Sequence, residues 1–156
     1  MIKRRWFGAT LLLLGCGGAA AGPGAVHPST SPSAAVTGFL QAVSDSNLAA
    51  MASLWGSASG PSSRTRQPSD YERRIIIMQA YLRHDDSRIL TDTPAANPTR
   101  HAIQAQLRRS ACTWTVPFEV IQLSDSSWIV NSVDVAAAGN PARPCDPTTT
   151  DTSTSR

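Results

Sequence analysis

Residues 99–135 read TRHAIQAQLRRSACTWTVPFEVIQLSDSSWIVNSVDV and decide the fold class. Apolar and polar residues alternate between Thr99 and Arg109, which is the period of a half-buried strand. The apolar face of that strand carries His101, Ile103, Ala105 and Leu107. The segment 112–123 is rich in β-branched and aromatic residues, and Pro117 within it indicates a bulge or a sheet edge. After a Ser-Asp-Ser turn, the segment 127–135 completes an antiparallel hairpin.

The sequence before this meander has helical spacing. Ser31 followed by Pro32 is typical of a helix start, and Val36, Phe39, Leu40 and Val43 then recur on one face. Asn47 can cap a second helix, whose stripe is Leu48, Met51 and Trp55 before Gly56 ends it. The segment 56–68 is rich in Gly, Ser and Pro and predicts a polar loop.

A third helix follows this loop. Ser69 and Glu72 have the spacing of a capping box, in which the serine oxygen takes a backbone amide and the glutamate reaches back. Its apolar stripe follows at spacings of four, three and four residues: Tyr71, Ile75, Met78 and Leu82. A short strand over residues 87–93 then leads into the meander.

This order predicts an α+β domain at residues 31–138. Two to three N-terminal helices should pack on a curved antiparallel sheet of about four strands. Residues 139–156 are rich in Pro, Thr and Ser, and we expect this tail to be mostly disordered.

The N-terminus predicts a location. A positive segment (Lys3, Arg4, Arg5) precedes a nine-residue apolar run that is too short to span a bilayer. Leu13-Leu14-Gly15-Cys16 then resembles the lipobox of bacterial lipoproteins. The resemblance implies a signal peptide at residues 1–15, cleavage after Gly15, and palmitate-type acyl chains on Cys16. The alternatives are an ordinary secretory signal with a chance cysteine and a buried apolar N-terminal strand.

The rest of the N-terminal region fits this location. Residues 16–30 would be the lipidated cysteine and a flexible tether. In Gram-negative members of the lipoprotein class, Gly17 instead of Asp implies the outer membrane. We therefore expect a lipid-anchored protein of the cell envelope, facing the periplasm or the exterior.

The cysteine count agrees with an oxidising compartment. Acylation of Cys16 leaves Cys112 and Cys145, which we expect to form a disulfide. The alternatives are a buried free Cys112 or a reactive Cys145 in the tail.

The charge balance argues against nucleic acid as a partner. Of 14 Lys and Arg residues, three lie in the positive segment of the signal, which leaves 11 against 11 Asp and Glu. A mature chain so close to neutral has no net charge to attract nucleic acid.

The order of helices and strands is similar to the nuclear-transport-factor-2-like superfamily, including SnoaL-like domains of the cystatin-like fold. The similarity rests on SAAVTGFLQAVSDSNLAAMASLWG at residues 33–56, an apolar helical stripe, a polar break and a second stripe. It implies a pocket between sheet and helices. Members of that superfamily include isomerases, hydratases and plain binding domains, so the resemblance does not select a function.

An enzyme of this kind needs an inward-facing base. His101 on its apolar strand face and Asp134 are candidates, with Tyr71 as a hydrogen-bond donor in the pocket. The alternative is a packing role for His101 and Tyr71. Glu119 and Asp134 could meet across the last hairpin, although alternation turns Glu119 outward. His84-Asp85-Asp86 resembles a fragment of a metal site but is typical of a solvated turn.

These observations favour a non-catalytic domain that binds a small ligand or an envelope protein. We expect no cofactor and no metal, because the sequence contains no Gly-rich phosphate loop, no G-x-S-x-G motif and no clustered ligand set. The alternatives are an enzyme of the same fold, isomerase-like or hydratase-like, and a structural self-assembly module.

Overall fold

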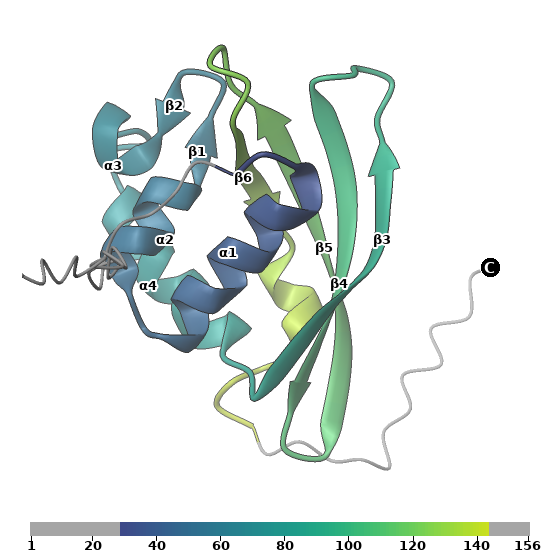
Figure 1. Cartoon of the computed structure of the whole chain (residues 1–156). Coiled ribbons are helices and arrows are strands. Elements are labelled where there is room, and N and C mark those ends of the chain that lie inside the picture. The colour runs from purple at the N-terminus through teal and green to yellow at the C-terminus, as the bar shows by residue number, and fades with distance from the viewer. Residues whose placement is uncertain (1–28, 144–156) are drawn as a thin grey trace, which may run out of the picture.

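The computed structural model describes residues 29–143. In this range the helices lie on one side of an antiparallel sheet, which confirms the predicted α+β class (Figure 1). The elements in chain order are α1 (Pro32–Ser44), α2 (Leu48–Leu54), β1 (Gly56–Ser57), β2 (Gly60–Pro61), α3 (Ser62–Thr65), α4 (Tyr71–Leu82), β3 (Asp86–Pro94), β4 (Arg100–Arg109), β5 (Cys112–Gln122), β6 (Trp128–Val133) and a short 3-10 helix η1 (Val135–Ala138). Gly15, Cys16, the tether to residue 28 and Cys145 lie outside the described residues.

The main sheet is a meander with the strand order β3-β4-β5-β6. Strands β4 and β5 pair along their whole length, from Arg100 opposite Ile121 to Arg109 opposite Cys112. Strand β6 pairs only with the C-terminal part of β5, beginning at Phe118 opposite Val133. Pro117 therefore lies just outside the paired segment of β6, where the missing proline N–H costs no ladder hydrogen bond. The sequence predicted a bulge or a sheet edge at Pro117, but β5 is an interior strand and the irregular pairing with β6 lies between Glu119 and Val120.

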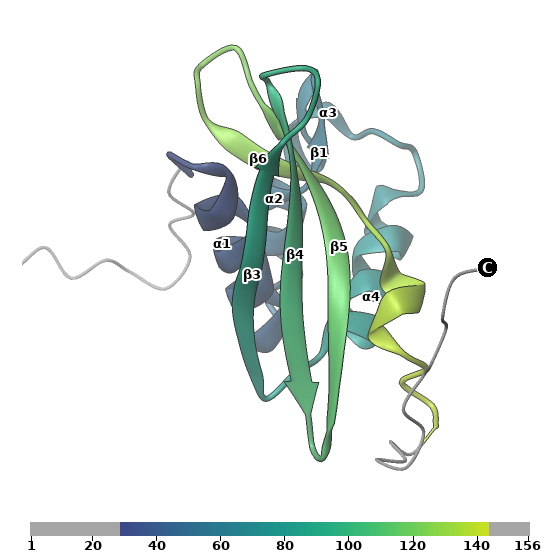
Figure 2. The same ribbon diagram turned by 90° about the vertical axis from the view of Figure 1, so that its right-hand side faces the viewer.

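The helices bury one face of this sheet. Figure 2 shows β3, β4 and β5 in front with the helices behind them. The face predicted from alternation is buried as expected, with Ile103, Ala105 and Leu107 at 2% exposure or less. Helix α1 lies directly on the sheet, and its Phe39 meets Phe118 of β5 edge to face at 6.5 Å between ring centroids. Burial of this apolar surface is the main stabilising contribution to the fold.

The first two helix starts are confirmed. The Ser31 side chain accepts a hydrogen bond from the backbone N–H of Ala34, and Pro32 occupies the first helical position. The Asn47 side chain accepts from the N–H of Ala50 at 3.0 Å. Both caps satisfy amides that the first helical turn leaves without a backbone partner.

The predicted capping box of the third helix is wrong. Helix α4 begins at Tyr71 after Asp70, and no side chain caps it. The chain turns just before the helix, where the Tyr71 N–H donates to the Pro68 carbonyl. Glu72 accepts from the Tyr71 hydroxyl and does not reach back. The predicted stripe of α4 is nevertheless correct, because Tyr71, Ile75, Met78 and Leu82 are all buried.

The segment 56–68 is more ordered than the predicted loop. It forms the β1–β2 hairpin and α3, closed by Ser62, whose buried hydroxyl donates to the Gln67 carbonyl at 2.7 Å. A Cβ on Gly56 would lie 2.3 Å from the Gly60 carbonyl oxygen, so the hairpin needs glycine there. A local rule that treats Gly and Ser as loop formers misses this hairpin.

The last strand is shorter than predicted. β6 ends at Val133, and the Asp134 side chain accepts from the N–H groups of Ala136 and Ala137 at the start of η1. Val135 thus belongs to η1 and not to a strand. At the other end of the domain, Ser29 forms an antiparallel bridge with Trp128.

Candidate functional site

A groove between α2 and α4 is the first candidate site. It has a volume of about 310 Å³, is open to solvent on one side, and is mostly apolar. Its lining residues are Leu48, Ala49, Ala52, Tyr71, Glu72, Ile75 and Ile76. Leu48 was predicted in the buried stripe of the second helix, but its side chain is 41% exposed because it lies at the groove margin in the first turn of α2.

Exposed Ile76 extends the apolar surface of the groove. Ile76 is 55% exposed, and its neighbour Ile77, which does not line the groove, is 40% exposed. Both lie off the buried stripe of α4, where helical spacing places polar side chains in most surface helices. Large apolar side chains beside a hollow are a recognised mark of a binding surface.

Polar groups gather at one end of the groove around Tyr71. The Arg66 guanidinium lies over the Tyr71 ring at 5.1 Å and donates to its hydroxyl at 2.7 Å. The hydroxyl donates to Glu72 at 2.9 Å, and this hydrogen bond raises the pKa of Tyr71 above its usual value of 10.0. Arg66 also pairs with Glu72 at 3.3 Å, so the three side chains form one small network.

The second candidate is a histidine–carboxylate pair at the N-terminal end of β4. His101 Nδ1 lies 2.6 Å from Asp92 Oδ1 of β3, and Asp92 Oδ2 accepts from the Ser33 hydroxyl of α1 at 2.6 Å. The His101 ring also meets Trp128 edge to face, with 5.0 Å between ring centroids. Burial raises the pKa of Asp92, but hydrogen bonds from Ser33 and His101 outweigh it and leave the pKa below 3.8.

The chemistry of this pair follows from the orientation of the carboxylate. An ionised Asp92 accepts from an N–H at Nδ1, which leaves Nε2 of a neutral imidazole as the basic nitrogen. Ser33 donates to the carboxylate and not to the imidazole, so the pair does not activate the serine as a nucleophile. The arrangement suits a general base oriented by a carboxylate.

Sequence reasoning missed Asp92 and Arg66. Ile89 of β3 pairs with Ala105 of the buried face, and strict alternation would turn Asp92, three residues later, to the other face. The pairing shifts between Ile89 and Thr91, so Asp92 lies opposite Ile103 on the helix side. A bulge of this kind leaves no clear sign in a single sequence. Arg66 follows α3, which was predicted as loop.

The sequence-predicted candidates take part in separate sets of contacts. Tyr71 belongs to the groove, His101 to the pair with Asp92, and exposed Asp134 caps η1. Glu119 lies off the buried face as predicted and pairs with Arg100, which also contacts Asn131.

The structure assigns local contacts to the remaining polar candidates. His84 Nδ1 lies 2.8 Å from the Leu82 carbonyl, and the Asp85 carboxylate accepts from the Ser110 N–H at 2.7 Å. Among residues 29–143, no three His, Cys, Asp or Glu side chains are arranged to hold a metal ion. No helix in the same range has the length and apolar character needed to cross a membrane.

Comparison with known proteins gives no relative for this chain. No family model, no curated protein and no solved structure matches it.

Proposed function

We propose that this protein is a lipid-anchored domain of the cell envelope that binds a partner protein through the groove between α2 and α4. The groove and its exposed apolar margin carry the proposal. The segment from Lys3 to Cys16 supports the location, and the order of helices before a meander is what the resemblance to nuclear-transport-factor-2-like binding domains implies.

The shape of the groove favours a protein over a small molecule. Its volume of about 310 Å³ is at the low end of the range for ligand pockets, and it is open on one side. A small ligand there would keep much of its surface in water. Ile76 projects beyond the hollow, so a broader partner surface would bury more apolar area.

The polar end of the groove fits the same kind of partner. Arg66 and Glu72 are each about two-thirds exposed and flank the Tyr71 hydroxyl. An apolar centre beside a charged rim is the usual arrangement of a protein interface. The expected occupant is one or two apolar side chains of an envelope protein, with a polar backbone or side-chain group facing Arg66 and Glu72.

Neighbouring isoleucines provide a matched test. A photoreactive phenylalanine analogue at position 48 should crosslink the partner in intact cells. Ile76→Glu, which places a charge at the groove, should abolish the crosslinked product, whereas Ile77→Glu on the same helix should leave it unchanged. Both side chains are exposed, so both variants should fold, which thermal unfolding checks. Equal crosslinking in the two variants, or none in the parent, would refute the proposal.

The location has its own test. Cys16→Ser should abolish incorporation of a labelled fatty acid and release the protein from membranes, because two or three acyl chains are needed for stable anchoring. Fatty-acid labelling that persists in this variant would exclude Cys16 as the lipidated residue. The crosslinking result does not depend on this outcome, so each part can fail alone.

A second function is favoured by the 2.6 Å contact between His101 and Asp92. An imidazole held by a carboxylate can act as a general base. The probe is hydrolysis of p-nitrophenyl acetate near pH 8. His101→Ala and Asp92→Asn should both lower a catalysed rate, and His84→Ala should not. Equal rates in the parent and the three variants would mean that His101 and Asp92 have only a structural role.

A further inference from the structure

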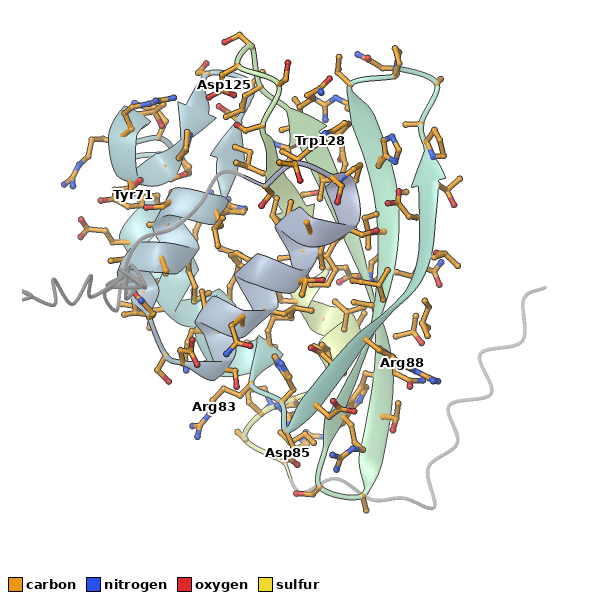
Figure 3. All side chains as sticks on the ribbon, in the orientation of Figure 1. Tyr71, Arg83, Asp85, Arg88, Asp125 and Trp128 are labelled. Atoms are coloured by element: carbon orange, nitrogen blue, oxygen red, sulfur yellow. The ribbon has the colours of Figure 1, made fainter. Side chains whose placement is uncertain are left out.

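A second hollow lies at the C-terminal end of α4, away from the groove. It has a volume of about 360 Å³ and a mostly polar lining. Helix α4 and the turn after it, the end of β4, and the segment after η1 enclose it. The lining residues are Gln79, Ala80, Arg83, His84, Asp85, Arg109 and Pro141. In Figure 3, Arg83 and Asp85 lie at the lower end of the molecule, far from Tyr71.

Arg109 is held in this hollow by one ring contact and three long hydrogen bonds. Its guanidinium stacks on the Trp114 ring at 4.7 Å and donates to the carbonyls of Tyr81, Arg83 and Ala138 at 3.3–3.4 Å. Gly139 makes this stacking possible, because a Cβ there would lie 2.7 Å from the Trp114 indole nitrogen. These contacts place the guanidinium at the hollow without a ligand.

No carboxylate neutralises Arg109 within the described part of the chain. Its three hydrogen-bond partners are neutral carbonyls, and it takes part in no ion pair there. These carbonyls use both N–H groups of one terminal nitrogen and one of the other. The remaining terminal N–H and the Nε–H make no hydrogen bond with residues 29–143. A guanidinium offers five donors in a planar fork, so two are left for an oxyanion.

Arg83 adds a second positive charge at the mouth of the hollow. Its side chain is exposed and makes no hydrogen bond or ion pair within residues 29–143. Asp85 is the one carboxylate in the lining, and one of its oxygens already accepts from the Ser110 N–H. Two guanidinium groups against one carboxylate leave a net positive charge of one.

We propose that this hollow, here called the basic pocket, binds the phosphate group of a small phosphate ester. Arg109 supplies donors positioned by the fold and Arg83 supplies exposed donors, which together can clamp a tetrahedral oxyanion. Asp85 would repel a bare anion but can accept from a hydroxyl or ammonium group beside the phosphate. The shared chemistry is therefore a phosphate with a neighbouring hydrogen-bond donor, whether in a free metabolite or a lipid head group.

The test follows the indole N–H resonance of Trp114 during titration of the full-length lipidated protein in non-ionic detergent micelles. Glycerol 3-phosphate should shift this resonance saturably, whereas sodium chloride at equal ionic strength should not. Arg83→Gln should weaken binding about tenfold, the loss expected for one charge-assisted hydrogen bond. Arg73→Gln is the matched control, because Arg73 is an exposed arginine of α4 that lies outside the pocket.

The outcomes separate the possible ligands. Tighter binding of glycerol 3-phosphate than of inorganic phosphate supports an ester and the role of Asp85. If vesicles of phosphatidylglycerol shift the Trp114 resonance more than vesicles of phosphatidylcholine do, the ligand is a lipid head group. Equal effects of the two vesicles point to a free metabolite. A shift that never saturates, or equal affinity in Arg83→Gln and Arg73→Gln, would overturn the proposal.

Discussion

The two ends of α4 differ in what they leave uncovered. At the N-terminal end, Ile75 and Ile76 border a groove whose surface is mostly apolar. At the C-terminal end, Arg83 and Arg109 border a pocket whose surface is mostly polar. One helix of 12 residues thus presents two hollows of similar volume and different chemistry. The buried stripe fixes the position of the helix, and the residues beside the stripe decide what each end can bind.

The largest loss of stability is expected from a substitution at Ile75, on the floor of the groove. Ile75 is 2% exposed and belongs both to the core and to the groove lining. Ile75→Ala should lower the free energy of unfolding by about 2–4 kcal/mol, because it removes buried methyl groups and leaves a cavity. Ile77→Ala, at an exposed site of the same helix, should change it by less than about 0.5 kcal/mol. Urea unfolding followed by circular dichroism measures both values. Similar losses in the two variants would mean that α4 does not bury the stripe described above.

An intermediate effect is expected at the basic pocket. Arg109→Gln removes the stacking on Trp114 and the donors to three carbonyls, and should cost about 1–2 kcal/mol. Arg108→Gln is the control, because Arg108 is exposed on the same strand and does not line the pocket. Thermal unfolding of the two variants compares them. No difference would mean that Arg109 is not part of the structural support of α4.

The smallest expected effect is a loss of stability at alkaline pH, caused by Tyr71 at the N-terminal end of α4. Tyr71 keeps its proton more tightly in the folded chain, since its hydroxyl donates to Glu72. Above pH 10 the unfolded chain releases this proton first, so stability should fall as the pH rises from 10 through the raised pKa. Tyr71→Phe should reduce that alkaline loss relative to the parent protein. Urea midpoints at pH 8 and pH 11 provide the measurement. An identical alkaline loss in the parent and in Tyr71→Phe would contradict the raised pKa.

The sequence predicts the fold better than it predicts the sites, for physical reasons. The regular spacing of apolar residues along a helix or a strand decides which side chains are buried. The stripe from Tyr71 to Leu82 and the face from Ile103 to Leu107 can therefore be predicted. The groove depends on the gap between α2 and α4, and no local pattern encodes that gap. Leu48 shows the limit, because it fits the helical stripe and is exposed at the groove margin.

Long-range pairing explains the other missed residues. Asp92 reaches His101 only because of the irregular pairing between β3 and β4. Arg109 lies between Trp114 and three carbonyl groups from distant parts of the chain. Such contacts depend on tertiary structure, whereas the alternation in β4 is a property of the strand alone.

The bridge between Ser29 and Trp128 has a mechanical consequence if Cys16 carries the anchor. The tether would then enter the fold at Ser29, which is held to β6 by the Trp128 N–H at 2.9 Å from its carbonyl oxygen. A pulling force applied at Ser29 would load this hydrogen bond before it loads α1. Under tension the hydrogen bond between Ser29 and Trp128 would break and later re-form. The tether would become longer while the domain stays folded.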